Sequence, residues 1–169
     1  SPHRVTPDKQ GLIISPADGK VLPVINDFPP DEKDKKEKMK RISIFMNIFN
    51  VHVNRIPYSG KILSMRYYPG AFFNASLDKS SKENERMVLK IRLENGLIIY
   101  VVQIAGLIAR RIKCDLTEGQ MVKSGEKFGI IRFGSRVDVY LPMNFSLNVL
   151  EGQTIICLLY TSPSPRDGW

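Results

Sequence analysis

The chain has few of the residues on which small stapled folds and metal centres depend. Its 169 residues include two cysteines, two histidines and one tryptophan. Cys114 and Cys157 are far apart, and neither His3 nor His52 has a cysteine or carboxylate at a metal-ligand spacing. The sequence therefore predicts no metal site, and two unclustered cysteines favour a reduced, cytosolic setting.

Long apolar runs and regular repeats are also missing. The longest apolar stretch, residues 97–102, is far shorter than the ~18 residues of a membrane span. No triplet glycine and no sustained heptad occur, which excludes collagen and coiled coils. No apolar segment follows the first four residues, so no signal peptide is expected. Because the chain begins with serine, we expect a fragment or a processed form.

Positive charge is in excess, with 25 Lys and Arg against 17 Asp and Glu, a net charge of +8. Such a surface attracts nucleic acid or an anionic bilayer. The densest charged run, residues 31–41, mixes both signs and is typical of a solvated loop. No strand pair interleaves lysines with aromatic residues, so we expect no nucleic-acid partner.

Short β-type runs separated by turn residues dominate the pattern, and no long segment has helical periodicity. Asn95-Gly96, between two of these runs, is typical of a tight hairpin turn. The spacing predicts a mainly β, barrel- or sandwich-like single domain of short antiparallel strands with low helix content. The expected strands are residues 11–14, 20–25, 42–46, 51–56, 61–68, 87–93, 97–104, 127–132, 136–141 and 153–156.

Three segments differ from this pattern. Residues 26–40 are polar and charged and predict a mobile loop. Residues 69–86 form a long loop with adjacent aromatic residues, Phe72 and Phe73, and long loops in compact β domains are often functional. Residues 158–169 predict a flexible tail, not native to a domain of residues 1–157, because its two prolines cannot continue a central strand.

The most informative segment is residues 128–142, FGIIRFGSRVDVYLP, in which Gly134-Ser135 separates two expected strands. This segment resembles the self-processing site of the pyruvoyl-dependent phosphatidylserine decarboxylases, in their short bacterial and archaeal form. Further stretches resemble the same family in the same order. They are residues 15–21 (SPADGKV), 50–57 (NVHVNRIP), 74–79 (NASLDK), 83–86 (ENER), 103–106 (QIAG) and 109–112 (ARRI).

The resemblance implies a zymogen of phospholipid biosynthesis that cleaves itself between Gly134 and Ser135. In the family, the serine hydroxyl attacks the preceding carbonyl to give an ester. Elimination then leaves dehydroalanine, which hydrolyses to a covalent pyruvoyl cofactor and ammonia. Decarboxylation of phosphatidylserine to phosphatidylethanolamine and CO₂ needs such an electron sink, which ordinary side chains lack.

The resemblance also assigns catalytic roles to Ser135, His52 and Asp18. Serine needs a base, and an ordinary histidine pKa of ~6.5 suits proton transfer. Arg55 stands where longer bacterial relatives carry a second histidine, which leaves the base for self-cleavage open. Asp18 matches the relay aspartate of the family, and Asp138 is an alternative carboxylate.

Substrate-binding candidates are fewer. Arg136 is expected either to pair with a substrate phosphate or carboxylate or to be a solvated arginine at a strand end. Phe72 and Phe73 are expected either to form part of an apolar rim where the lipid headgroup enters or to be ordinary core residues.

The expected partners are a phospholipid substrate and an anionic membrane surface. The two cleavage fragments are expected to remain associated, and homo-oligomerisation stays open. We expect peripheral attachment to the cytoplasmic face of the cell membrane, with a hydrophobic N-terminal segment of the family missing here.

Three alternatives remain at this point, and one of them keeps the fold without the activity, as a pseudoenzyme that never cleaves itself. Residues 118–126 have the turn rhythm of biotinyl- and lipoyl-type hybrid-barrel carriers or adaptors, although no Met-Lys-Met attachment hairpin occurs. An archaetidylserine decarboxylase would use the same fold on an ether lipid with the same headgroup.

Overall fold

The computed structural model describes ten parts of the chain. They are residues 13–14, 19–31, 33, 37–46, 52–94, 96–107, 112–131, 134–146, 154–155 and 160–163.

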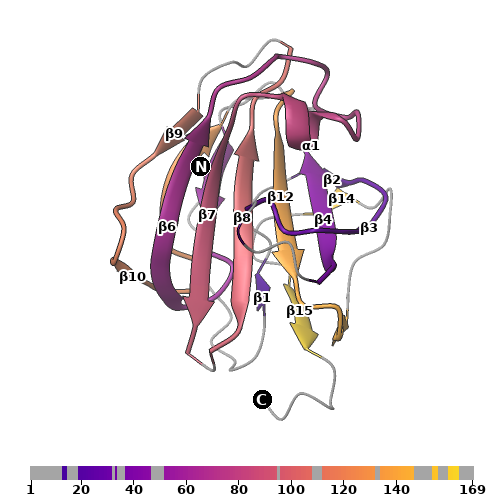
Figure 1. Cartoon of the computed structure of the whole chain (residues 1–169). Helices are drawn as coiled ribbons and strands as arrows, with labels where there is room; N and C mark the ends of the chain where they lie inside the picture. The colour runs from indigo at the N-terminus through magenta and orange to yellow at the C-terminus, as the bar shows by residue number, and fades with distance from the viewer. Residues whose placement is uncertain are drawn as a thin grey trace.

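One large antiparallel sheet forms the centre of the structure (Figure 1). Its strand order is β10-β6-β7-β8-β12-β4-β2-β14, and β3 also pairs with β4. The bounds are β10 Met121–Val122, β6 Gly60–Tyr68, β7 Arg86–Leu93, β8 Ile98–Ile104, β12 Arg136–Leu141, β4 Met39–Phe45, β2 Gly19–Val21, β14 Thr154–Ile155 and β3 Ile25–Asp27.

Two three-stranded sheets make up the rest of the β structure that the model describes. The first has the order β5-β11-β9, with β5 at His52–Arg55, β11 at Lys127–Ile131 and β9 at Ile112–Cys114. The second has the order β1-β15-β13, with β1 at Ile13–Ile14, β15 at Tyr160–Pro163 and β13 at Phe145–Ser146.

The central strands β8 and β12 are buried on both faces of the large sheet. Their side chains alternate between the two faces, and both faces are covered there. On one face, Leu89, Val101 and Val139 belong to the larger core cluster, which also includes Ile56 and Phe128 from outside the large sheet. On the other face lies a smaller cluster of Val88, Tyr100, Val102, Ile104 and Tyr140. The polar groups described below share this second face.

The expectation of a mainly β domain with little helix is confirmed. The described residues contain one helix, α1 (Ser80–Glu83), and every pair of strands is antiparallel. The hairpin expected between β7 and β8 also forms: Gly96 has a φ of +88°, and its N–H donates to Leu93 O at 2.9 Å. Asn95 lies outside the described residues.

Two segment predictions need correction. Residues 26–40 are not a single loop, because their first two residues complete β3 and their last two begin β4. The tail is not wholly without structure, since Tyr160–Pro163 forms β15 between β1 and β13. Pro163 is the last residue of β15, which agrees with the expectation that proline does not continue a central strand. Of the rest of residues 158–169, nothing is described.

Strand register gathers distant parts of the sequence at one end of the large sheet. Tyr68 pairs with Arg86, Arg86 with Ile104, Ile104 with Arg136, and Arg136 with Phe45. We call the end of the large sheet at this row the upper end, as it is drawn in Figure 1; α1 also lies there. The loop of residues 69–85 and the segments that follow β8 and precede β12 therefore meet there.

Candidate functional site

The Gly134-Ser135 peptide lies at the upper end, directly before β12. Gly134 has a φ of +80°, in the left-handed region that favours glycine. Its N–H donates to Met46 O, and Met46 N–H donates to Ser135 O at 3.0 Å. Ser135 and Met46 are both fully buried. The backbone thus holds this peptide in a conformation that a residue with a side chain adopts only under strain.

Gly106, two residues beyond β8, lies against the same peptide. A Cβ on Gly106 would overlap the Gly134 carbonyl oxygen and lie 2.8 Å from the Gly134 carbonyl carbon. It would also lie 3.4 Å from Ser135 N. Only a glycine at 106 leaves room for this carbonyl group.

His52 begins β5, where its backbone pairs with Ile131 at the end of β11. Ile131 is three residues before Gly134, so the register brings His52 to the strand that leads into the Gly134-Ser135 peptide. The side chain of His52 and the whole of Asp18 lie outside what the structure describes.

Other residues of the histidine segment have structural partners. Arg55 Nη1 donates to Gly125 O at 3.1 Å, which secures the turn before β11. The buried Asn54 accepts a hydrogen bond from Gln103 Nε2 at 2.9 Å, linking β5 to β8. The strand that carries His52 is therefore tied to the strand that leads to Gly106.

Arg136 is not the solvated strand-end arginine that was one of the two expectations. Its side chain is 1% exposed. Nη1 donates to the carbonyl oxygens of Ala75 and Leu77, both at 3.0 Å, and Nη2 donates to Ser81 Oγ. These partners lie in the loop that folds over the second face of the sheet, so the guanidinium anchors that loop to β12.

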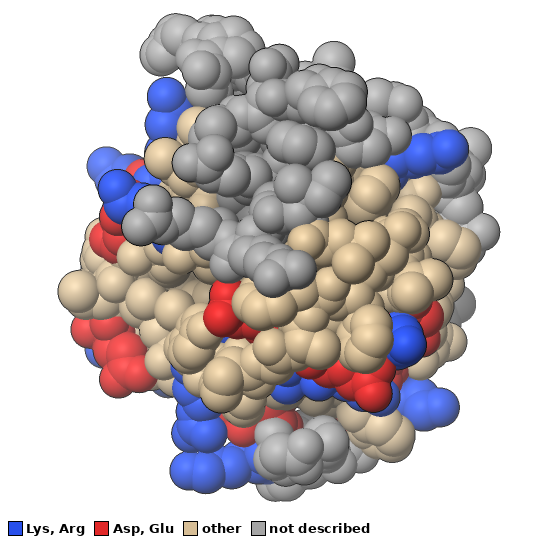
Figure 2. Space-filling view, turned by 90° about the horizontal axis from the view of Figure 1, so that it is seen from above, with Lys and Arg blue, Asp and Glu red and all other residues tan. Residues whose placement is uncertain are grey.

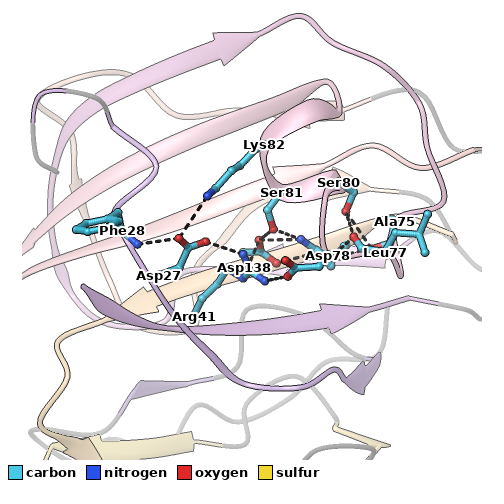
Figure 3. Close-up of polar contacts among 11 residues, drawn as sticks. Asp27, Phe28, Arg41, Ala75, Leu77, Asp78, Ser80, Ser81, Lys82 and Asp138 are labelled. Atoms are coloured by element: carbon cyan, nitrogen blue, oxygen red, sulfur yellow. Dashed lines mark hydrogen bonds and ion pairs between the residues drawn. The ribbon is translucent and has the colours of Figure 1, made fainter. Parts of the chain in front are cut away.

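Asp138, two residues further along β12, forms ion pairs with two buried arginines, Arg136 and Arg41. Figure 3 shows Asp138 beside Arg41. Its Oδ1 is 2.9 Å from Arg136 Nε, and its Oδ2 is 3.9 Å from Arg41 Nε. Ser81 Oγ donates to Oδ2 at 2.7 Å. The carboxylate is fully buried and so is held by ionic and hydrogen-bonding partners, not by solvent.

Arg41 extends this cluster to β3 and the loop. Its Nη1 donates to Asp27 Oδ2 at 2.8 Å, and its Nη2 donates to Asp78 Oδ1. Burial lowers the pKa of Arg41, but the negative charge of Asp138, together with the hydrogen bond and charge of Asp78, outweighs burial and raises it. The guanidinium is therefore firmly cationic.

Tyr140 shares this environment. Burial, and next the negative charge of Asp138, raise the pKa of its phenol well above the ordinary value. The hydroxyl remains protonated across the physiological range. Tyr140 therefore adds no negative charge to the cluster.

The loop of residues 69–85 carries the two predicted aromatic residues. Asn84 fixes it: its Nδ2 donates to Phe73 O at 2.8 Å and to Ala105 O at 2.7 Å, and its Oδ1 accepts from Phe73 N. Phe72 is half-buried, whereas Phe73 is 37% exposed with Lys79 Nζ 3.9 Å from the centre of its ring. Phe73 is thus at the surface of the upper end.

Sequence reasoning assigned no role to Gly106, Ser81 or Asn84. Each lies in or beside a stretch that resembles the decarboxylase family, which is the signal that could have drawn attention to them. Gly106 and Gly134 are 28 positions apart, Ser81 and Asp138 are 57 apart, and Asn84 and Ala105 are 21 apart. Spacing along the chain could not reveal those contacts.

Comparison with known proteins gives one consistent result. The family model described as "Phosphatidylserine decarboxylase" matches residues 1–157. The proteins named "Phosphatidylserine decarboxylase proenzyme" from Rickettsia akari (strain Hartford) and Rickettsia bellii (strain OSU 85-389) are each 57% identical over 157 residues. Each match covers 92% of this chain and 68% of the relative.

This match does not favour the carrier alternative. It extends over the region that contains the Gly134-Ser135 peptide, Gly106 and the buried cluster around Asp138. With a family model over most of the chain and relatives at this identity, the chain belongs to the phosphatidylserine decarboxylase family of carboxy-lyases.

Proposed function

We propose that the chain cleaves itself between Gly134 and Ser135 and that the mature protein decarboxylates phosphatidylserine to phosphatidylethanolamine and CO₂. The observation that carries the proposal is the Gly134-Ser135 peptide itself. It combines a left-handed glycine, a buried serine and close backbone contacts to Met46 and Gly106, in a chain of this family.

The residues around Ser135 fit a prosthetic group made from the chain. Ser135 is fully buried at the start of a central strand, and its preceding carbonyl lies beside a glycine with no side chain. A pyruvoyl group there would supply a ketone that accepts the electrons left when CO₂ departs. Burial would exclude water from that reaction.

The chain's own groups have distinct roles in self-cleavage. Ser135 Oγ is the nucleophile, and Gly134 provides an unhindered carbonyl. We assign proton transfer to His52, whose backbone register supports this role, and orientation of His52 to Asp18. The hydrogen bonds from Arg55 and Gln103 would keep β5 in register during the reaction.

Cleavage would leave the two fragments joined without a covalent link. β12 would belong to the C-terminal fragment, while its neighbours β4 and β8 would belong to the N-terminal fragment. Arg136 would add hydrogen bonds to Ala75, Leu77 and Ser81 across the same boundary. The buried contacts support a stable complex of the fragments.

The experiment that tests the proposal is intact-mass analysis of the purified protein. We expect two chains, residues 1–134 and 135–169, with the smaller one blocked to N-terminal sequencing. Borohydride should add hydrogen to the smaller chain, because a ketone is reducible and a serine is not. A single uncut chain of full mass would contradict the proposal.

A membrane surface is the proposed partner, because the lipid substrate resides there. Among the described residues of the upper end, uncharged ones cover much of the visible face, with some Asp and Glu side chains between them, and most Lys and Arg side chains lie toward its margins (Figure 2). Phe73 and Leu107, from the segments that meet there, are 37% and 52% exposed. A net charge of +8 favours the anionic cytoplasmic leaflet. Among the described residues, the only helix is far too short to cross a bilayer.

Replacing both Phe73 and Leu107 with aspartate should weaken binding to vesicles of phosphatidylserine and phosphatidylcholine at least about tenfold, because apolar burial is lost. Cosedimentation measures this change. The matched control is Met121→Asp: Met121 is 67% exposed but pairs with Lys61, near the opposite end of β6. Equal weakening by the control would contradict docking through the upper end.

A further inference from the structure

Gly106 faces the atoms that would react in self-cleavage. A Cβ there would overlap the Gly134 carbonyl oxygen and approach the carbonyl carbon to 2.8 Å. Gly19, Gly60, Gly70 and Gly129 also lie close to carbonyl oxygens, but those oxygens belong to Phe45, Arg92, Glu83 and Lys113. What distinguishes Gly106 from these four glycines is that the carbonyl it contacts belongs to the bond to be broken.

Both partners in this contact are held in place. Ala105 N–H donates to Glu85 O at 3.0 Å, and Ala105 O accepts from Asn84 Nδ2 at 2.7 Å. On the other side, Met46 binds both Gly134 and Ser135 through its backbone. Neither segment can retreat from an added methyl group without breaking buried hydrogen bonds.

We propose that Gly106 is a positioning residue for self-cleavage: its bare α-carbon keeps open the place that the Gly134 carbonyl oxygen occupies when Ser135 attacks. This inference rests on the proposed function. In the attack, a bond forms between Ser135 Oγ and the Gly134 carbonyl carbon, and the bond from that carbon to Ser135 N breaks. The hydroxyl proton is transferred to the nitrogen, so the step needs no further reactant.

A methyl group at 106 must displace the carbonyl from the line of attack. We expect Gly106→Ala to slow cleavage about 100-fold, as judged from the usual cost of overpacking a rigid site. Cleavage is scored by intact mass in the soluble, monodisperse fraction only, so that a lower yield of folded protein does not count as slower cleavage.

Gly60→Ala is the matched control. A Cβ at Gly60 would overlap the carbonyl oxygen of Arg92, which is the same kind of clash at the opposite end of β6 and β7. Both variants should lose thermal stability, but G60A should still cleave at close to the wild-type rate. Equal slowing of the two variants would overturn the proposal, since Gly106 would then act only through stability.

Hydroxylamine separates the steps, because it rapidly cuts an ester between residues 134 and 135. The peptide bond that it also attacks, Asn-Gly, is at residues 95–96 in this chain and would give fragments of different masses. The soluble G106A precursor should show no cut after residue 134 in hydroxylamine, since the attack of Ser135 is the step that fails. Rapid cutting would overturn the proposal by showing that the ester forms normally. A G106A chain that fails to fold beside a folded G60A chain would overturn it too, as Gly106 would then be a folding requirement.

These outcomes are distinct from failure of the proposed function. If the wild-type chain remains uncut, self-cleavage itself is wrong. If the wild-type chain is cut and G106A is cut at the same rate, only the role of Gly106 is wrong.

Discussion

Ser135→Ala should leave the protein as one uncut chain of full mass that releases no CO₂ from phosphatidylserine. The substitution removes the only oxygen that can attack the Gly134 carbonyl from position 135, and it removes the atoms from which the electron-accepting group is made. Because alanine differs from serine only by the hydroxyl group, nothing larger enters this buried position, and we expect the fold to be kept. Intact mass and release of labelled CO₂ from carboxyl-labelled lipid measure the two losses.

Ser43→Ala is the matched control for this loss. Ser43 is also a buried serine, 1% exposed, on the strand next to β12, where it pairs with Asp138. This variant should be cut and should release CO₂ as the wild-type chain does. Cleavage that persists in S135A would remove Ser135 from the mechanism, whatever the control shows.

The longer strands were predictable because the alternation of side chains between the two faces of a strand can be read from neighbouring residues. Residues 87–93 and 136–141 alternate between the two faces of the sheet, and the structure has β7 at Arg86–Leu93 and β12 at Arg136–Leu141. The strands that the sequence did not reveal include β10 and β13, with two residues each. Two residues carry no period, so only their tertiary pairing defines them.

The one α-helix among the described residues escaped prediction for a similar reason. α1 has four residues, a single turn, and no apolar repeat can be read from that length. It forms within the loop because Ser80 and Ser81 are buried, with Ser80 Oγ donating to Leu77 O and Ser81 Oγ to Asp138. Tertiary contacts, not helix propensity, account for it.

The candidate site was predictable in its chemistry but not in its surroundings. The resemblance to the family identified Ser135, Gly134 and the histidine segment. Strand register places the described parts of these segments toward one end of the molecule. The burial of Arg136 could not be foreseen, because it depends on a loop some 60 positions earlier that folds over β12. A charged residue beside a turn ordinarily remains in solvent.

The second largest expected effect is on stability: neutralising Asp138 should lower the free energy of unfolding. Asp138→Asn removes the charge that faces Arg136 at 2.9 Å and Arg41 at 3.9 Å, and it leaves two buried guanidinium groups with less compensation. Breaking a buried ion pair on one side typically costs about 3–5 kcal/mol. For a chain of this size, that predicts a fall in melting temperature of roughly 6–20 °C.

The measurement is best made in the Ser135→Ala chain, because an uncut precursor unfolds as one molecule and its stability does not depend on fragment concentration. Asp115→Asn in the same chain is the control. Asp115 is 60% exposed and lies 3.9 Å from the exposed Lys113, so its loss should change stability by less than about 1 kcal/mol. If D138N and D115N unfold at the same temperature, the buried cluster does not secure β12, and the anchoring role given to Arg136 is wrong as well.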